Sequence, residues 1–196
     1  MRVFDRAAWA AVLLAIVLAA AGCGDPPTKE MNQAQGAIDA ARAAGAEQYA
    51  TDEYKAAVDA LRRAQDAVTQ RDYRQALNDA LDSRERAQNA AREASSQKAQ
   101  ARSQAERLVA EVTTALAAAT GRLDTARTAK VPAKALQTAQ DIVTSTQRAL
   151  QEAGTALGQE DYLTAQRVLV DRVAKVRAAA AQIDQILASH GKAPHK

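Results

Sequence analysis

The fold is decided by residues 73–120, which read YRQALNDALDSRERAQNAAREASSQKAQARSQAERLVAEVTTALAAAT. This stretch holds no glycine and no proline, and it is rich in the strong helix formers alanine, arginine, glutamine and glutamate. Its apolar residues recur at seven-residue steps, the spacing of a narrow coiled-coil seam: Tyr73, Ala80, Ala87, Ala94, Ala101 and Leu108. The stretch therefore predicts one long helix that packs through an alanine-rich stripe.

The flanking sequence predicts further helices with the same kind of seam. Seven-residue spacing recurs in two further series: Leu136, Val143, Leu150 and Leu157, then Tyr162, Leu169, Val176 and Ile183. Turn signals around residues 49–53, 70–73, 130–132 and 158–161 separate five helices, expected over residues 29–47, 52–70, 72–129, 132–158 and 161–189. We expect an all-α, elongated coiled-coil-like bundle.

Several side chains are placed to cap these helices. Thr28 precedes the first predicted helix, and Thr51 or Asp52 precedes the second. Asp72 and Gln75 have the spacing of a capping box at the start of the long helix. Each cap would satisfy backbone N–H groups that a first helical turn leaves without partners.

The chain contains one helical unit twice. Residues 36–44 match residues 121–129 at an offset of 85, and residues 61–76 match residues 150–165 at an offset of 89. The difference of four residues is about one helical turn, which keeps a packing stripe roughly on the same face. We therefore expect two three-helix units that share the long central helix, over residues 31–98 and 99–189. Chance similarity between alanine-rich helices is the alternative.

Residues 1–22 have the pattern of a secretory signal peptide. Arg2 and Arg6 precede fifteen uncharged residues, Ala7 to Ala21. That run is too short to cross the hydrocarbon layer, which needs about 20 residues, but it suits the apolar region of a signal peptide. We expect this segment to be removed.

Residues 18–23, LAAAGC, resemble the lipobox of bacterial lipoproteins, with Ala20 where the pattern prefers leucine. The resemblance implies that Cys23, the sole cysteine, receives a diacylglycerol and becomes an acylated mature N-terminus. Several acyl chains would hold the protein firmly on a membrane. Cleavage after Ala21 by the ordinary signal peptidase, which leaves Cys23 as a free thiol, is the alternative.

The residue after the cysteine bears on which membrane holds the protein. In lipoproteins sorted between two membranes, aspartate at this position tends to retain the protein at the inner one, and here Gly24 follows. The resemblance therefore implies the inner leaflet of the outer membrane, facing the periplasm. Residues 23–30 would form the lipid anchor and a short linker stiffened by Pro26 and Pro27.

The composition argues against several functional classes. A single cysteine excludes a disulfide scaffold and a cysteine-rich metal module. From Cys23 onward there are 24 Lys and Arg against 22 Asp and Glu, and the signs alternate along the chain. Nucleic-acid binding needs a basic stripe with interleaved aromatic residues, so we expect no nucleic-acid partner.

The groups that carry catalysis or bind metals are scattered. His190 and His195 are too isolated for a metal site and fall in a predicted polar tail over residues 190–196. Carboxylates such as Asp79, Asp82 and Glu85 alternate with arginines and are interpreted as solvated ion pairs. We therefore expect no catalytic residue, no metal site and no cofactor.

Residues 40–50, AARAAGAEQYA, precede the patterns Leu61-x-x-Ala64 and Asp72-Tyr73-x-x-Ala76. Together these resemble a family of alanine-rich helical bacterial envelope lipoproteins that is filed as a domain of unknown function. The resemblance covers about residues 34–100 and, more weakly, residues 120–185. Because its motifs are helix and turn features, it implies a fold and a compartment but no activity.

Two classes of function remain. The first is a non-enzymatic, lipid-anchored scaffold or spacer of the cell envelope. The second is a helical adaptor that binds a partner protein of a transport, secretion or wall-maintenance system. Residues 82–107, in which no apolar side chain is larger than alanine, are expected to join the two units. They form either a continuous solvated helix or a hinge or docking face, and Ser103 and Glu106 are spaced to cap a fresh helix start.

Overall fold

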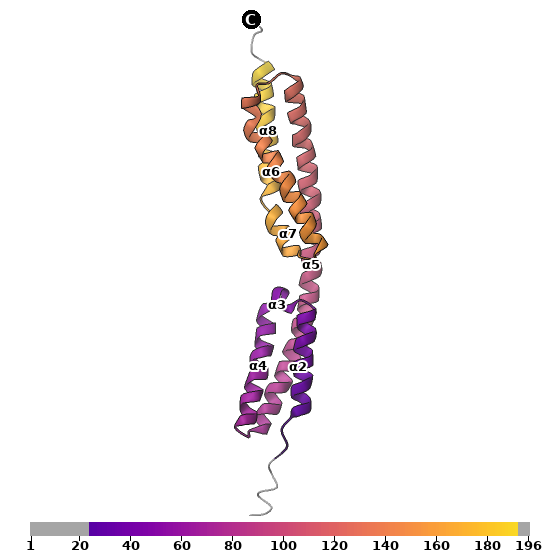
Figure 1. The fold of residues 1–196 in the computed structure, drawn as a ribbon, viewed down its shortest axis with the longest axis vertical. Coiled ribbons are helices and arrows are strands. Elements are labelled where there is room, and N and C mark those ends of the chain that lie inside the picture. Colours follow the sequence, from indigo (N-terminus) through magenta and orange to yellow (C-terminus); the bar gives the residue numbers. More distant parts are fainter. Residues whose placement is uncertain (1–23, 192–196) are drawn as a thin grey trace, which may run out of the picture. The chain divides into compact units, whose positions relative to one another are not determined.

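The computed structural model describes residues 24–191, and every regular element in that range is an α-helix (Figure 1). These residues divide into two compact units, the first ending at Ser96 and the second beginning at Gln97. Helix α5 (Tyr73–Thr128) contributes to both units. The all-α fold class predicted from the sequence is confirmed.

Unit 1 consists of α2 (Thr28–Ala43), the single-turn α3 (Ala46–Tyr49), α4 (Thr51–Thr69) and the first part of α5. Its core is mostly alanine, and the larger buried members are Ile38, Tyr54 and Leu61. Because alanine adds little bulk, the helix axes can approach the short end of the usual range of about 8–10 Å. The short connections make neighbouring helices antiparallel, so α2 and α5 run in the same direction.

Unit 2 consists of the rest of α5, α6 (Ala133–Gly158), α7 (Tyr162–Leu169) and α8 (Arg172–Gly191). Its core holds more branched aliphatic side chains than that of unit 1. The bulkiest fully buried hydrophobic side chains in the described range all belong to it: Leu123, Leu169, Ile183, Val112 and Val176. Most residues of the seams predicted from the seven-residue spacing are therefore buried in these units, whereas Tyr73, Leu108, Leu150 and Leu157 are only half-buried.

Corresponding turns in the two units have the same backbone conformation. Gly45, after α2, and Lys130, after α5, stand 85 residues apart and have φ values of 86° and 59°. Arg71, after α4, and Glu160, after α6, stand 89 residues apart and have φ values of 60° and 59°. A left-handed residue just beyond the helix end lets the next N–H groups reach the last free carbonyls. The two sequence offsets thus recur as two pairs of equivalent turns.

The second pair of turns also repeats its cap. The Asp72 carboxylate accepts the backbone N–H of Gln75, and the Asp161 carboxylate accepts that of Thr164, each at 3.0 Å. Each aspartate precedes a tyrosine and, three residues further on, a fully buried alanine. The aspartate cap predicted before the long helix is confirmed, and its counterpart in unit 2 has the same geometry.

The predicted bounds of the three middle helices are correct to within one residue, whereas the two outer helices are interrupted. The helix expected over residues 29–47 ends at Ala43, because Gly45 adopts the left-handed conformation. The helix expected over residues 161–189 breaks between Leu169 and Arg172. Three valines and an aspartate surround that break, and such residues favour other conformations over helix. Helix α8 also continues past residue 189, so His190 lies in its last turn instead of a tail.

Two of the predicted caps are wrong. Thr28 is already the first residue of α2, and no side chain caps that helix. Helix α4 begins at Thr51, and no side-chain cap from Thr51 or Asp52 precedes it. The Thr51 hydroxyl instead donates to the carbonyl of Glu47 at 2.9 Å, which ties α4 to the preceding short helix.

Helix α5 runs through the stretch predicted to join the units, and no fresh start occurs at Ser103. Ala87, Ala90 and Ala94 belong to the core of unit 1, and Ala101 and Ala105 are buried in turn. Buried alanines therefore occur along most of residues 82–107, the stretch predicted to join the units. The longest run within this stretch that lacks a buried side chain is residues 95–100.

Candidate functional site

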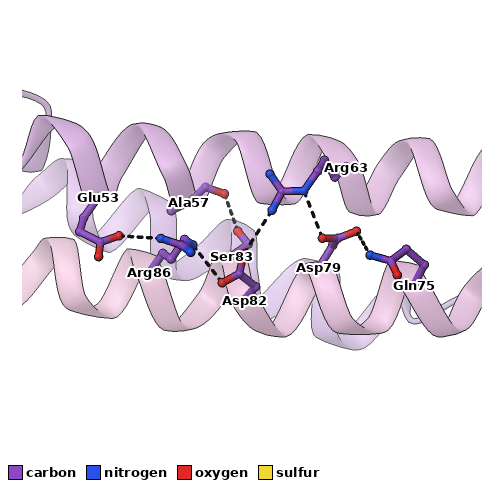
Figure 2. A network of polar contacts seen from close by, with 8 residues as sticks. All are labelled: Glu53, Ala57, Arg63, Gln75, Asp79, Asp82, Ser83 and Arg86. Carbon is purple, nitrogen blue, oxygen red and sulfur yellow. Dashed lines mark hydrogen bonds and ion pairs between the residues drawn. The ribbon is translucent and has the colours of Figure 1, made fainter.

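A ladder of five charged side chains joins α4 to α5 in unit 1 (Figure 2). Arg63 of α4 donates from Nε to Asp79 Oδ1 and from Nη2 to Asp82 Oδ2, each at 3.2 Å. Arg86 of α5 donates from Nε to Asp82 Oδ1 at 2.9 Å and from Nη1 to Glu53 Oε2 at 3.2 Å. The charges alternate in sign along this α4–α5 ladder, and each arginine bridges two carboxylates.

Two polar side chains of this region are buried. Asp79 is 8% exposed and Ser83 is fully buried. The second oxygen of Asp79 accepts from Gln75 Nε2, and Ser83 Oγ donates to the carbonyl of Ala57, both at 2.8 Å. A buried polar group without a partner is strongly destabilising, so these bonds are what makes the burial tolerable.

The prediction that Asp79 is a solvated carboxylate is wrong. It fails because α4 packs over this part of α5 and covers the side chain. Glu85 is exposed as predicted, and Asp82 is partly exposed within its ion pairs. The side chain of Gln75 bonds to Asp79, so the predicted capping box is present only on the Asp72 side.

We interpret the ladder as a device that fixes the register of α4 on α5. An alanine seam is nearly uniform along its length, so packing alone discriminates poorly between neighbouring registers. A shift by one turn would separate Asp79 from Arg63 and Ser83 from Ala57, which would leave buried polar groups unpaired. Polar groups in a core are best attested in this role.

Replacing Asp79 by alanine is expected to lower the free energy of unfolding by about 1–3 kcal/mol, because Arg63 and Gln75 lose their shared acceptor. Urea unfolding of residues 24–196, followed by circular dichroism, measures the change. Replacing the exposed Glu85 by alanine is the matched control and should change stability by less than about 0.5 kcal/mol. Equal stabilities for the two variants would contradict a structural role of the ladder.

A second polar cluster lies at the other end of unit 1, around α3. The Tyr54 hydroxyl donates to Glu47 Oε1 at 3.0 Å, and Arg42 Nε donates to the same oxygen at 3.1 Å. The hydrogen bond from Arg42 lowers the pKa of Glu47, and burial raises the pKa of Tyr54. Glu47 therefore stays ionised and Tyr54 stays protonated at neutral pH, which suits a clasp between α2, α3 and α4.

An open groove lies between α5 and α7 in unit 2. Its volume is about 540 Å³, and its lining combines three aliphatic side chains with five polar or charged ones: Leu108, Leu163 and Val170, and Gln104, Arg107, Glu111, Gln166 and Arg167. Val170 is 61% exposed and Leu163 is 38% exposed. Aliphatic side chains gathered in an exposed groove are typical of a protein-binding surface.

The comparisons with known proteins bear on unit 1. Residues 29–106 match the model of the family described as Domain of unknown function (DUF4398). The match runs from the start of α2 into the second half of α5 and includes the whole α4–α5 ladder. It supports the expected resemblance as far as a domain of unknown function. No curated protein and no solved structure matches the chain significantly.

The predicted lipid-attachment residue, Cys23, lies outside the described residues, as do the predicted signal peptide and His195. His190 is exposed on α8. Between residues 24 and 191, no three or more His, Cys, Asp or Glu side chains are grouped as metal ligands would be. Within the same range, no helix has both the length and the apolar character needed to cross a bilayer.

The burial of Asp79 and Ser83 in α5 was not predicted from the sequence, although the sequence carries a signal for it. Ser83 stands three residues after Ala80 and four before Ala87, so it occupies a position of the seam itself. Asp79 stands three residues after Ala76 and therefore shares its side of the helix. A hydroxyl and a carboxylate at seam positions indicate a buried polar contact, but they do not identify its partner.

Proposed function

We propose that the protein is a non-enzymatic cell-envelope lipoprotein, held on a membrane by a lipid on Cys23, and that it serves as a helical scaffold or spacer in the periplasm. The observation that carries the scaffold role is the repetition of one helical unit, with equivalent left-handed turns and aspartate caps. Repetition of a packing unit extends a structure without adding chemistry, as in other repeat proteins.

Two features support the anchor. One is the sequence that ends at Cys23, and the other is the short leader, residues 24–27, that joins Cys23 to α2. Cys23 stands two residues after the uncharged run of the predicted signal peptide and is the sole cysteine. Pro27 is buried, and its carbonyl accepts the N–H of Met31 at 3.0 Å. The four residue steps from Cys23 to Pro27 can span at most about 14 Å, so the lipid would hold unit 1 close to the bilayer.

Replacing Cys23 by serine is expected to abolish incorporation of a labelled fatty acid in cells. It should also release the protein from the membrane fraction or leave the signal peptide attached, because serine lacks the thiol that receives the diacylglycerol. Replacing the neighbouring Gly24 by serine is the matched control, since it keeps the thiol and should leave labelling unchanged. Unchanged labelling of the Cys23→Ser variant would refute the anchor.

The groove in unit 2 favours a second candidate function, an adaptor that binds an envelope partner protein. Leu163 in the groove and Val58 on α4 have nearly equal exposure, 38% and 40%. A photo-crosslinking residue at position 163 should then give one discrete product in intact envelopes, whereas one at position 58 should not. Equal yields at the two positions would argue against the adaptor.

A further inference from the structure

The turn between α4 and α5 lies at the end of unit 1 from which the leader departs (Figure 1). Arg84 of α5 donates from Nη1 to Gln33 Oε1 of α2 at 2.7 Å, which aligns the two parallel helices. Gln33 is five residues from the start of α2, whereas Arg84 is eleven residues from the start of α5. The α4–α5 turn therefore projects about six residues, or about 9 Å, beyond the start of α2.

Two arginines on this turn make no side-chain contact that would stabilise the described part of the fold. Arg71 and Arg74 are both exposed, and among residues 24–191 neither guanidinium has a hydrogen bond or ion pair. Tyr73 lies between them and is half-buried. The turn thus carries two unpaired guanidinium groups and an amphipathic tyrosine, a combination suited to a membrane–water interface.

The equivalent turn in unit 2 shows that the fold does not require these arginines. It has the same left-handed residue and the same aspartate cap, but Glu160 stands at the position of Arg71 and Leu163 at that of Arg74. Glu160 Oε2 accepts from Lys98 Nζ at 2.6 Å, so its charge is paired within unit 2. The free arginines are therefore particular to the turn beside the leader.

We propose that Arg71 and Arg74 bind phosphates of anionic phospholipids in the membrane that holds the Cys23 lipid. The inference rests on the lipid anchor proposed above, because a leader of at most about 14 Å brings this turn within reach of the bilayer surface. A guanidinium pairs with phosphate through two parallel hydrogen bonds. Unit 1 would then stand on the membrane by its α4–α5 turn.

The binding is local pairing and does not depend on overall charge. Residues 24–96 carry ten Lys and Arg against thirteen Asp and Glu, a net charge of −3, so long-range attraction to an anionic surface is absent. Of the carboxylates near the turn, Asp72 is used as a helix cap, and Asp66 is exposed and opposes the contact. The attraction between the two arginines and the lipid phosphates must therefore exceed the repulsion between Asp66 and those phosphates.

The test uses the chain from Cys23 to Lys196, coupled through its sole cysteine to a maleimide lipid in vesicles. Anchoring then does not depend on acylation in cells. Amide hydrogen exchange over residues 68–76 should be slower on phosphatidylcholine–phosphatidylglycerol vesicles than on phosphatidylcholine alone. Exchange over residues 157–165, the equivalent turn, should be the same on both and serves as an internal control.

The double variant Arg71→Gly, Arg74→Gln should lose this difference, because each arginine at an anionic surface strengthens association by about fivefold. Glycine suits the left-handed conformation at position 71, so the turn itself is preserved. Arg92→Gln, an exposed change near the other end of unit 1, should keep the difference.

Equal exchange on the two vesicle types, or an unchanged difference in the double variant, would overturn the contact. That result leaves the natural anchor untouched, since fatty-acid labelling of Cys23 in cells is measured separately. Conversely, a positive vesicle result together with an unlabelled Cys23 would support lipid binding by the turn and refute only the anchor.

Discussion

Replacing Leu123 by alanine is expected to lower the free energy of unfolding by about 2–5 kcal/mol. Leu123 is 2% exposed and is among the largest fully buried side chains of the described residues. Its neighbours in the core include Ala119 and Ala126, whose short side chains cannot move in to fill the space. The cavity left behind adds to the lost hydrophobic transfer energy, so the effect should lie toward the upper part of that range.

Urea unfolding of residues 24–196, followed by circular dichroism, measures this change. Leu163→Ala is the matched control, because it removes the same atoms from a side chain that is 38% exposed. The control should lose less stability, because it buries a smaller apolar area and leaves no enclosed cavity. Similar losses for the two leucines would show that the core of unit 2 is not packed as described.

Enlarging a seam alanine should be destabilising for the opposite reason. Replacing Ala87 by leucine is expected to lower the free energy of unfolding by about 1–3 kcal/mol or more, because the added atoms force apart helices that pack closely. Ala87 is fully buried in the core of unit 1.

The control for this second change lies on the same helix. Ala99 is exposed within the run of residues 95–100 that lacks a buried side chain, so Ala99→Leu should change stability by less than about 0.5 kcal/mol. Thermal unfolding of both variants by circular dichroism makes the comparison. A stabilised Ala87→Leu variant would mean that unit 1 has unfilled space along its seam, contrary to the close approach described.

The helices were predictable from the sequence because one strong local signal determines them. Seven-residue spacing and high helix propensity act along α5, and its residues 73–120 hold no glycine and no proline, so the predicted bounds of this helix are correct to within one residue. The interruptions at Gly45 and after Leu169 were not predictable to the same degree. The first depends on one glycine and the second on a short group of residues, and their conformation is set by packing as much as by propensity.

The candidate functional residues also differ in whether a local sequence pattern indicates them. Cys23 is indicated by a local pattern, and its lipid stays a prediction because the structure describes residues 24–191. The partner of Asp79 could not be predicted, since Arg63 stands sixteen residues away on another helix. Only the register of α4 on α5 brings the two together, and that register depends on many weak alanine contacts that no local pattern specifies.

The sharing of α5 makes this architecture open to lengthening. In unit 2, α7 and α8 together take the place that the first part of α5 takes in unit 1, as the repeated aspartate caps show. Continuing α8 would therefore supply the first helix of a further unit, just as α5 continues from unit 1 into unit 2. A chain of this design can gain or lose whole units while each core stays intact, so the number of units can evolve separately from the stability of each one.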